Sequence, residues 1–74
     1  MKLSELNKGD RAVIKKIDTS EDLKIRLASF GVVRGSELSV EAYSLGKQTI
    51  EINVEGTLIG LRADEAKEIE VKKL

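Results

Sequence analysis

Acidic side chains are the main groups of this 74-residue sequence that could hold a metal ion, because the sequence contains neither His nor Cys. Glu51, Asn53 and Glu55 recur at every second residue, so they share the outer face of a predicted strand. Asp64–Glu65 follow in a short connector. Selective sites for transition-metal ions usually include imidazole or thiolate ligands. We therefore interpret these carboxylates as solvated charges on a sheet, and we expect no metal site and no cofactor.

The sequence also lacks the usual means of catalysis. General acid–base catalysis most often uses His, and nucleophilic catalysis needs an activated Ser, Cys, Thr or Lys. Without His or Cys, only a site based on carboxylates or Lys remains. A phosphate-binding loop is not indicated either, because the glycines are isolated from one another. They are Gly9, Gly31, Gly35, Gly46, Gly56 and Gly60. We predict that the protein is not an enzyme.

Charge and composition restrict the classes of partner. The 13 Lys and Arg residues balance 13 Asp and Glu residues, whereas a nucleic-acid-binding protein normally has a basic excess. The sequence shows no signal peptide and no apolar run of membrane-spanning length. We therefore expect a cytoplasmic protein that does not insert into a membrane. Since 41% of the residues are hydrophobic but only 3% are aromatic, Leu, Ile and Val must supply the core.

One helix is predicted to follow a first strand over residues 11–17. Thr19 is placed to cap the N-terminus of this helix, since acidic residues follow it in the first turn. Gly31 can adopt the left-handed conformation that ends a helix. Between these two residues, one apolar stripe recurs at helical spacing: Leu23, Leu27 and Phe30.

The rest of the chain alternates with a period of two, which predicts antiparallel strands with one buried face. Strands are expected over residues 38–43, 50–55, 58–62 and 68–72, with turns at 44–47 and 55–57 and a connector at 63–67. This pattern predicts a single domain over residues 1–74, mainly β with one α-helix, folded as a small antiparallel β-barrel. Its predicted core residues are Val13, Leu27, Phe30, Leu38, Val40, Ile52, Val54, Leu61 and Val71.

Three segments together resemble the FeoA family. They are Leu3-Ser4-Glu5-Leu6 with Gly9; Arg26-Leu27, Phe30-Gly31 and Gly35; and Ile52-Asn53-Val54-Glu55-Gly56 with Ile59-Gly60-Leu61-Arg62, Glu65-Ala66 and Ile69-Glu70-Val71. The resemblance spans nearly the whole chain. It implies an SH3-like barrel and a small cytoplasmic accessory protein of bacterial ferrous iron uptake. The implied partner is FeoB, a membrane permease with a cytosolic GTP-binding domain. Unlike many members of the family, this chain has no Pro around its central hairpin or after its helix.

A small protein without a catalytic, metal or cofactor site must act by binding other molecules through its surface. Ile25 lies on the helix away from the apolar stripe, and Leu45 lies at the tip of the central hairpin, where the loops of rigid scaffolds often carry function. We therefore predict that Lys24, Ile25 and Leu45 contribute to binding FeoB. Arg26 could contact a partner carboxylate, but we expect its stem to cover the edge of the core instead. The protein is expected to be a monomer or a weak oligomer.

Two other functions fit a small barrel. One is nucleic-acid binding, which would require a basic excess and stacked aromatic rings, whereas Phe30 and Tyr43 are the only rings present. The other is a regulatory SH3-like domain, because iron-dependent repressors have a related domain in their C-terminal part. Nothing in the sequence resembles the DNA-binding or metal-binding domains of those repressors.

Overall fold

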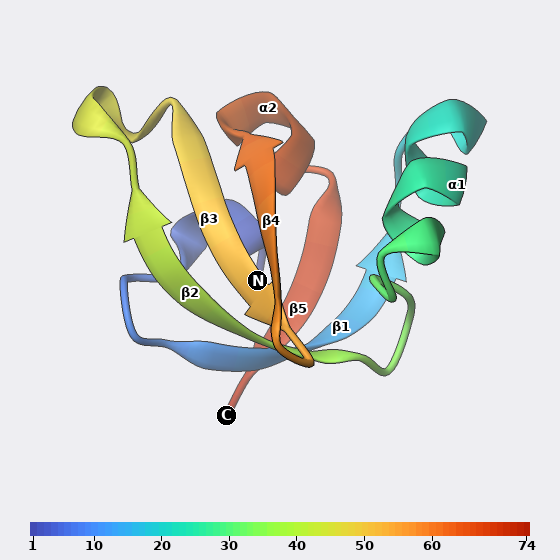
Figure 1. Ribbon diagram of the computed structural model, residues 1–74, viewed down its shortest axis with the longest axis horizontal. Coiled ribbons are helices and arrows are strands. Elements are labelled where there is room, and N and C mark those ends of the chain that lie inside the picture. The colour runs from blue at the N-terminus through green and yellow to red at the C-terminus, as the bar shows by residue number, and fades with distance from the viewer.

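The computed structural model describes residues 1–74 and contains one five-stranded antiparallel sheet (Figure 1). The strands are β1 (Arg11–Ile17), β2 (Glu37–Tyr43), β3 (Thr49–Val54), β4 (Thr57–Arg62) and β5 (Ile69–Lys73), in the spatial order β4-β3-β2-β1-β5. The helices are α1 (Glu21–Ser29), the one-turn α2 (Ala63–Ala66) and the 3-10 turns η1 (Leu3–Glu5) and η2 (Leu45–Lys47). This architecture confirms the predicted fold class. None of these helices is long and apolar enough to cross a lipid bilayer.

The sheet curves around its interior but does not close into a complete barrel (Figure 1). Its edge strands β4 and β5 do not pair with each other, so the barrel-like sheet keeps two edges. The N-terminal residues cover part of the β5 edge instead. Lys2 forms an isolated bridge with Glu70, and the N–H of Val71 donates to the carbonyl of Met1 at 2.8 Å. The edge of β4 has no such cover.

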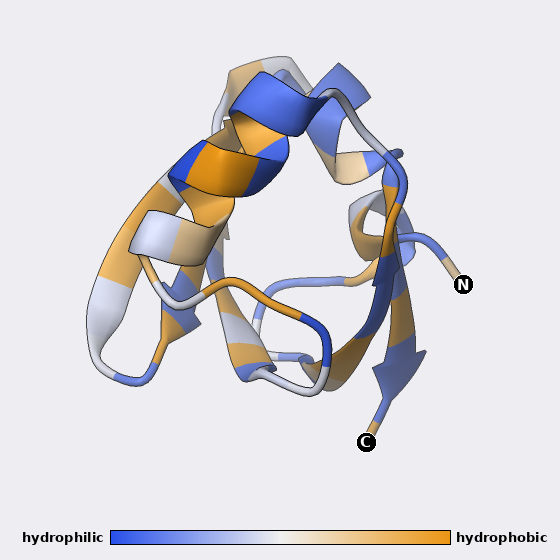
Figure 2. Ribbon diagram, turned by 90° about the vertical axis from the view of Figure 1, so that its right-hand side faces the viewer, coloured by the Kyte–Doolittle hydropathy of each residue, from blue (hydrophilic) through white to orange (hydrophobic).

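All 17 buried residues are hydrophobic, and together they form one core cluster. Every predicted core residue is buried except Val13 and Phe30. Val13 is half-buried because it alternates with Ala12 and Ile14, which take the inner face of β1. The stripe on α1 thus consists of Leu23 and Leu27, and Figure 2 shows the resulting alternation of hydrophobic and hydrophilic residues along that helix.

Phe30 is wrongly predicted as a core residue because α1 ends before it: its side chain is 48% exposed. The N–H of Gly31 donates to Ala28 at 3.0 Å and the N–H of Val32 donates to Leu27 at 2.9 Å, which is the Schellman pattern. Gly31 has a φ of 84°, as the sequence predicts. This turn directs Val32 into the core in place of Phe30.

The N-cap of α1 is Ser20 rather than the predicted Thr19. The hydroxyl of Ser20 accepts from the N–H of Leu23 at 3.3 Å. The hydroxyl of Thr19 instead donates to the carboxylate of Glu68, at 2.8 Å, and so ties the start of the helix to the residue before β5. Both hydroxyls are suitable caps, and the packing of the chain selects between them.

The tight turn between β3 and β4 is confirmed. Glu55 and Gly56 have φ values of 52° and 87°, and Val54 pairs with Thr57. Two consecutive positive φ values define the type I′ turn, whose twist matches that of antiparallel strands. Asn53 stabilises the turn by accepting the N–H of Gly56 at 2.9 Å.

Leu27→Ala should destabilise the protein by roughly 2–5 kcal/mol, because it removes a buried side chain from a core that no disulfide reinforces. Urea denaturation measures the free energy of unfolding. Ile25→Ala is the matched control on the exposed side of the same helix and should change it by less than about 0.5 kcal/mol. Equal stability of the Leu27→Ala variant and the wild type would contradict the core assignment.

Candidate partner-binding surface

The exposed side of α1 carries two of the predicted partner-binding residues. Ile25 is 66% exposed because Leu23 and Leu27 occupy the buried side of the helix. Lys24 is half-buried, and its ammonium lies 3.9 Å from the carboxylate of Glu21, one turn earlier. The helix therefore offers an apolar side chain next to a cation.

Leu45, the third predicted residue, begins η2 at the tip of the β2–β3 hairpin and is 100% exposed. The loop around it is ordered by hydrogen bonds, since the N–H of Thr49 donates to the hydroxyl of Ser44 at 2.9 Å. Figure 1 shows this hairpin and α1 at opposite ends of the molecule. The structure thus brings Lys24 and Ile25 together but places Leu45 apart from them.

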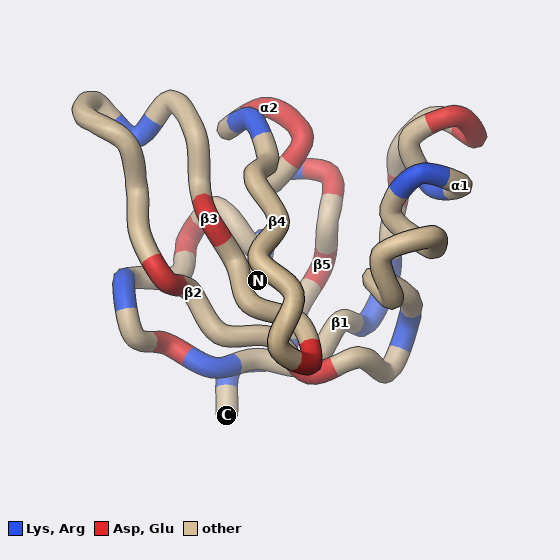
Figure 3. The backbone as a smooth tube through the Cα atoms, in the orientation of Figure 1, with Lys and Arg blue, Asp and Glu red and all other residues tan.

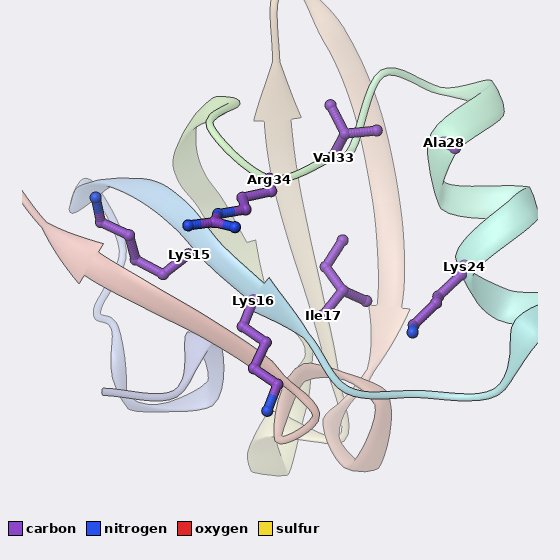
Figure 4. A pocket seen from close by; sticks show the side chains of 7 residues that line it. All are labelled: Lys15, Lys16, Ile17, Lys24, Ala28, Val33 and Arg34. Carbon is purple, nitrogen blue, oxygen red and sulfur yellow. The ribbon is translucent and has the colours of Figure 1, made fainter.

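A groove of about 580 Å³ lies between α1, the end of β1 and the loop that follows α1 (Figure 4). Its apolar lining is Ile17, Ala28 and Val33, and its polar lining consists of four cations: Lys15, Lys16, Lys24 and Arg34. No acidic residue lines it. We refer to these seven residues as the basic groove.

Two irregularities of the backbone place these cations. The pairing of β1 with β5 shifts register between Ile14 and Lys16, and this bulge breaks the alternation so that Lys15 and Lys16 are both exposed. A β-turn at residues 33–36, closed by the N–H of Ser36 donating to Val33 at 3.0 Å, holds Arg34. Its third residue, Gly35, has a φ of 92°, which only glycine adopts readily.

The turn is fixed against β1 by main-chain bonds to Ile14. The N–H of Gly35 donates to the carbonyl of Ile14 at 2.8 Å, and the N–H of Ile14 donates to Ser36 at 2.9 Å. Figure 4 shows the result: Arg34 lies next to Lys15, and Lys24 extends from α1 toward Ile17.

The cations of the basic groove are nearly free of partners within the chain. Lys15, Lys16 and Arg34 form no ion pair, and the pair of Lys24 with Glu21 is at the limit of contact. Blue segments in Figure 3 mark the same region, at the end of β1, in α1 and in the loop after it. The groove is therefore a local positive region on a chain with zero net charge.

Glu70 explains why Lys16 is unpaired. It faces Lys16 across the β1–β5 pair, but its carboxylate contacts the ammonium of Lys2 at 3.4 Å and the N-terminal ammonium at 3.6 Å. The ammonium of Lys2, and then the N-terminal ammonium, hold the pKa of Glu70 below its usual value of 4.5, although desolvation opposes the shift. The acid that could have neutralised Lys16 thus fixes the N-terminus instead.

The acidic residues singled out in the sequence do not come together. No group of three or more Asp and Glu side chains lies close enough to hold a metal ion. Glu55 belongs to the type I′ turn rather than to the strand face. Glu65 accepts the N–H of Arg62 at 2.9 Å and so caps α2, and it also contacts the guanidinium of Arg26 at 3.4 Å. Arg26 is therefore paired with a carboxylate of its own chain.

The two aromatic rings form no joint stacking surface. Tyr43 is half-buried, and its hydroxyl donates to the carbonyl of Leu6. Burial, and then the negative charge of Asp10, raises the pKa of Tyr43. Phe30 is exposed on another element, at the end of α1. Tyr43 thus connects β2 to the N-terminal segment, and the base-stacking platform expected of a nucleic-acid-binding barrel is absent.

The basic groove is the candidate binding feature that the sequence alone did not reveal. Two signals were present: the consecutive lysines Lys15-Lys16 interrupt the alternation of β1, and Arg34-Gly35 is typical of a turn that exposes its second residue. Neither signal shows that the two sites are neighbours.

Comparison with known proteins decides the family. The FeoA domain family model matches residues 1–73. The chain belongs to the FeoA family. A candidate Fe(2+) transport protein A of Campylobacter jejuni is 39% identical over 71 residues, which are 96% of this chain and 96% of that protein. The resemblance carried by the three sequence segments is thereby confirmed.

Two solved structures of FeoA proteins match closely. The FeoA protein from Chlorobium tepidum has 39% identity and a TM-score of 0.92, over 96% of this chain and 68% of that one. Stenotrophomonas maltophilia FeoA, solved with zinc and described as a prokaryotic SH3-domain protein, has 32% identity and a TM-score of 0.82, over 97% of this chain and 89% of that one. The expected SH3-like fold is confirmed.

The same fold occurs within a larger regulator. A manganese-dependent transcriptional repressor, solved with manganese, has 25% identity and a TM-score of 0.89 over all of this chain but only 36% of its own. The expected relation to metal-dependent repressors thus concerns one part of the repressor chain, which has the same fold as this protein.

Glu70→Gln should destabilise the FeoA chain at neutral pH but not at acidic pH. Because folding lowers the pKa of Glu70, the wild type gains stability from this carboxylate above pH 4.5 and loses it as the pH falls below that value. Urea denaturation across this range should show the two proteins converging in acid. Glu41→Gln, which removes an exposed carboxylate without an ion pair, is the control and should follow the wild type at every pH.

We predict that the purified protein binds no stoichiometric Fe²⁺. It has no imidazole or thiolate, and its carboxylates form no cluster. Anaerobic titration calorimetry with Fe²⁺ should give no saturable heat. One tight, saturable site would contradict this prediction.

Proposed function

We propose that this FeoA protein is a cytoplasmic accessory protein of bacterial ferrous iron uptake and that it acts, without catalysis, by binding the cytosolic part of the FeoB permease. The match of the family over residues 1–73 is the observation that carries this proposal. The names of two relatives support it, since one is a candidate Fe(2+) transport protein and the other is described as a candidate activating factor of bacterial ferrous iron transport.

We propose that the protein contacts FeoB through the exposed face of α1 at Lys24 and Ile25, or through the hairpin tip at Leu45. Support comes from the exposure of Ile25 and Leu45, which are large apolar side chains that the core does not use. Exposed apolar side chains on a rigid scaffold are typical anchors of protein interfaces. The positions differ in surroundings, because Ile25 lies next to a cation whereas Leu45 lies on an isolated loop.

Two substitutions test the surface: Ile25→Asp and Leu45→Asp. At least one of them should weaken binding to the purified cytosolic region of FeoB by about 2 kcal/mol, roughly 30-fold, because each buries a charge in place of an apolar anchor. Calorimetry or surface plasmon resonance measures the dissociation constant. Both variants should keep the free energy of unfolding within about 0.5 kcal/mol of the wild type.

Leu74→Asp is the matched control, because Leu74 is also apolar and is 60% exposed, at the C-terminal end. It should bind FeoB like the wild type. Wild-type affinity of both Ile25→Asp and Leu45→Asp would reject the surface assignment, and a wild type that does not bind FeoB would reject the proposed partner.

A further inference from the structure

The basic groove brings together positively charged side chains that form no close ion pair within the fold. Lys15, Lys16 and Arg34 come from two separate elements, point into water and have no acidic partner. These three unpaired cations repel one another and Lys24, which lowers the stability of the folded state slightly. On a chain with equal numbers of acids and bases, such a cluster indicates an external anion.

We propose that the basic groove binds an acidic segment of a partner protein, one that presents Asp or Glu side chains around an apolar residue. The proposal rests on the proposed function only for the identity of that partner, the FeoB permease. The charges of the groove would pair with the carboxylates, and its apolar lining would receive the side chain between them.

The lining favours a peptide because it combines charge with apolar surface. Ile17 is half-buried and Val33 is exposed, so hydrophobic surface remains open between the cations. Lys24 and Ala28 are four residues apart and lie on one side of α1, where the short Ala28 side chain leaves room beside the lysine. An apolar side chain placed there loses contact with water, while carboxylates on either side of it reach the lysines and Arg34.

Phosphate groups fit the groove less well. Phosphate sites in proteins usually use backbone N–H groups at a helix N-terminus or a glycine-rich loop. The N-terminus of α1 at Ser20 does not line the groove, and the first turn of the helix carries Glu21 and Asp22, which repel an anion. Nucleic acid would also require aromatic or extended basic surface, and no ring lines the groove.

An isotope-labelled NMR titration with a short peptide of alternating Glu, Leu and Gly tests the groove directly, at low ionic strength. The amide signals of residues 15–17, 24–28 and 33–35 should shift and saturate, and they should not shift with the same peptide carrying Gln in place of Glu. Added salt should weaken the binding, because the pairs are exposed to solvent. Absence of saturable shifts at these residues overturns the proposal.

The variant Lys16→Gln/Arg34→Gln should bind the Glu peptide about five- to tenfold more weakly, because it removes two ion pairs that are each weak where solvent reaches them. Lys8→Gln/Lys67→Gln is the matched control, since it removes the same charge from exposed positions outside the groove. If both variants bound the peptide equally weakly, the loss would come from net charge alone, and the assignment of the peptide to the groove would be wrong. Stronger shifts of the same amides with ATP or a short DNA duplex would overturn it as well.

The same two variants, assayed against the cytosolic region of FeoB, separate this inference from the proposed function. Loss of affinity in the groove variant alone supports both. If the wild type and both variants bind FeoB equally well, FeoB remains the partner but the groove does not receive it. If the wild type does not bind FeoB, the proposed partner is wrong, and the peptide titration still decides the chemistry of the groove.

Discussion

Main-chain bonds and strand pairing at Ile14 fix β1, β5 and the turn at residues 33–36 relative to one another. Its side chain is fully buried, its N–H and carbonyl both bond to the turn at residues 33–36, and its other edge faces Val71 of β5. The connection from α1 to β2 is therefore fixed at the middle of β1. Because the register shift of the sheet follows directly after Ile14, the same residue determines where Lys15 and Lys16 lie relative to Arg34.

Local rules predict most of the elements. Strict alternation identified β3 and β5 because each has one face in the core, and Gly31 and Gly56 identified a helix end and a hairpin because both need positive φ. The FeoA resemblance added the SH3-like arrangement of these elements, which alternation alone does not distinguish from other small barrels.

Features that depend on distant contacts were not predictable in this way. Phe30 continues the helical stripe in sequence, but the Schellman turn removes it from the helix and buries Val32 instead. The bulge at Lys15 exists only because β5 pairs with β1 across more than fifty residues of chain, as the register from Ile14–Val71 to Lys16–Glu70 shows. The basic groove combines that bulge with α1 and a turn, so no local pattern contains it.

Charge and core are separate in this molecule, and this separation affects how the protein can recognise a partner. No polar or charged side chain is buried, so the core places few demands on where the charged residues lie. Lys24 belongs both to the exposed face of α1 and to the basic groove, and a partner that covers Ile25 can therefore engage the groove in one continuous contact. Leu45 lies at the other end of a molecule 28 Å long, and a contact there requires a partner that spans the molecule or binds it in a second way. Of the two surfaces proposed for the partner, the α1 side therefore allows a single interface in which Ile25 would be the apolar anchor and the basic groove would select for charge.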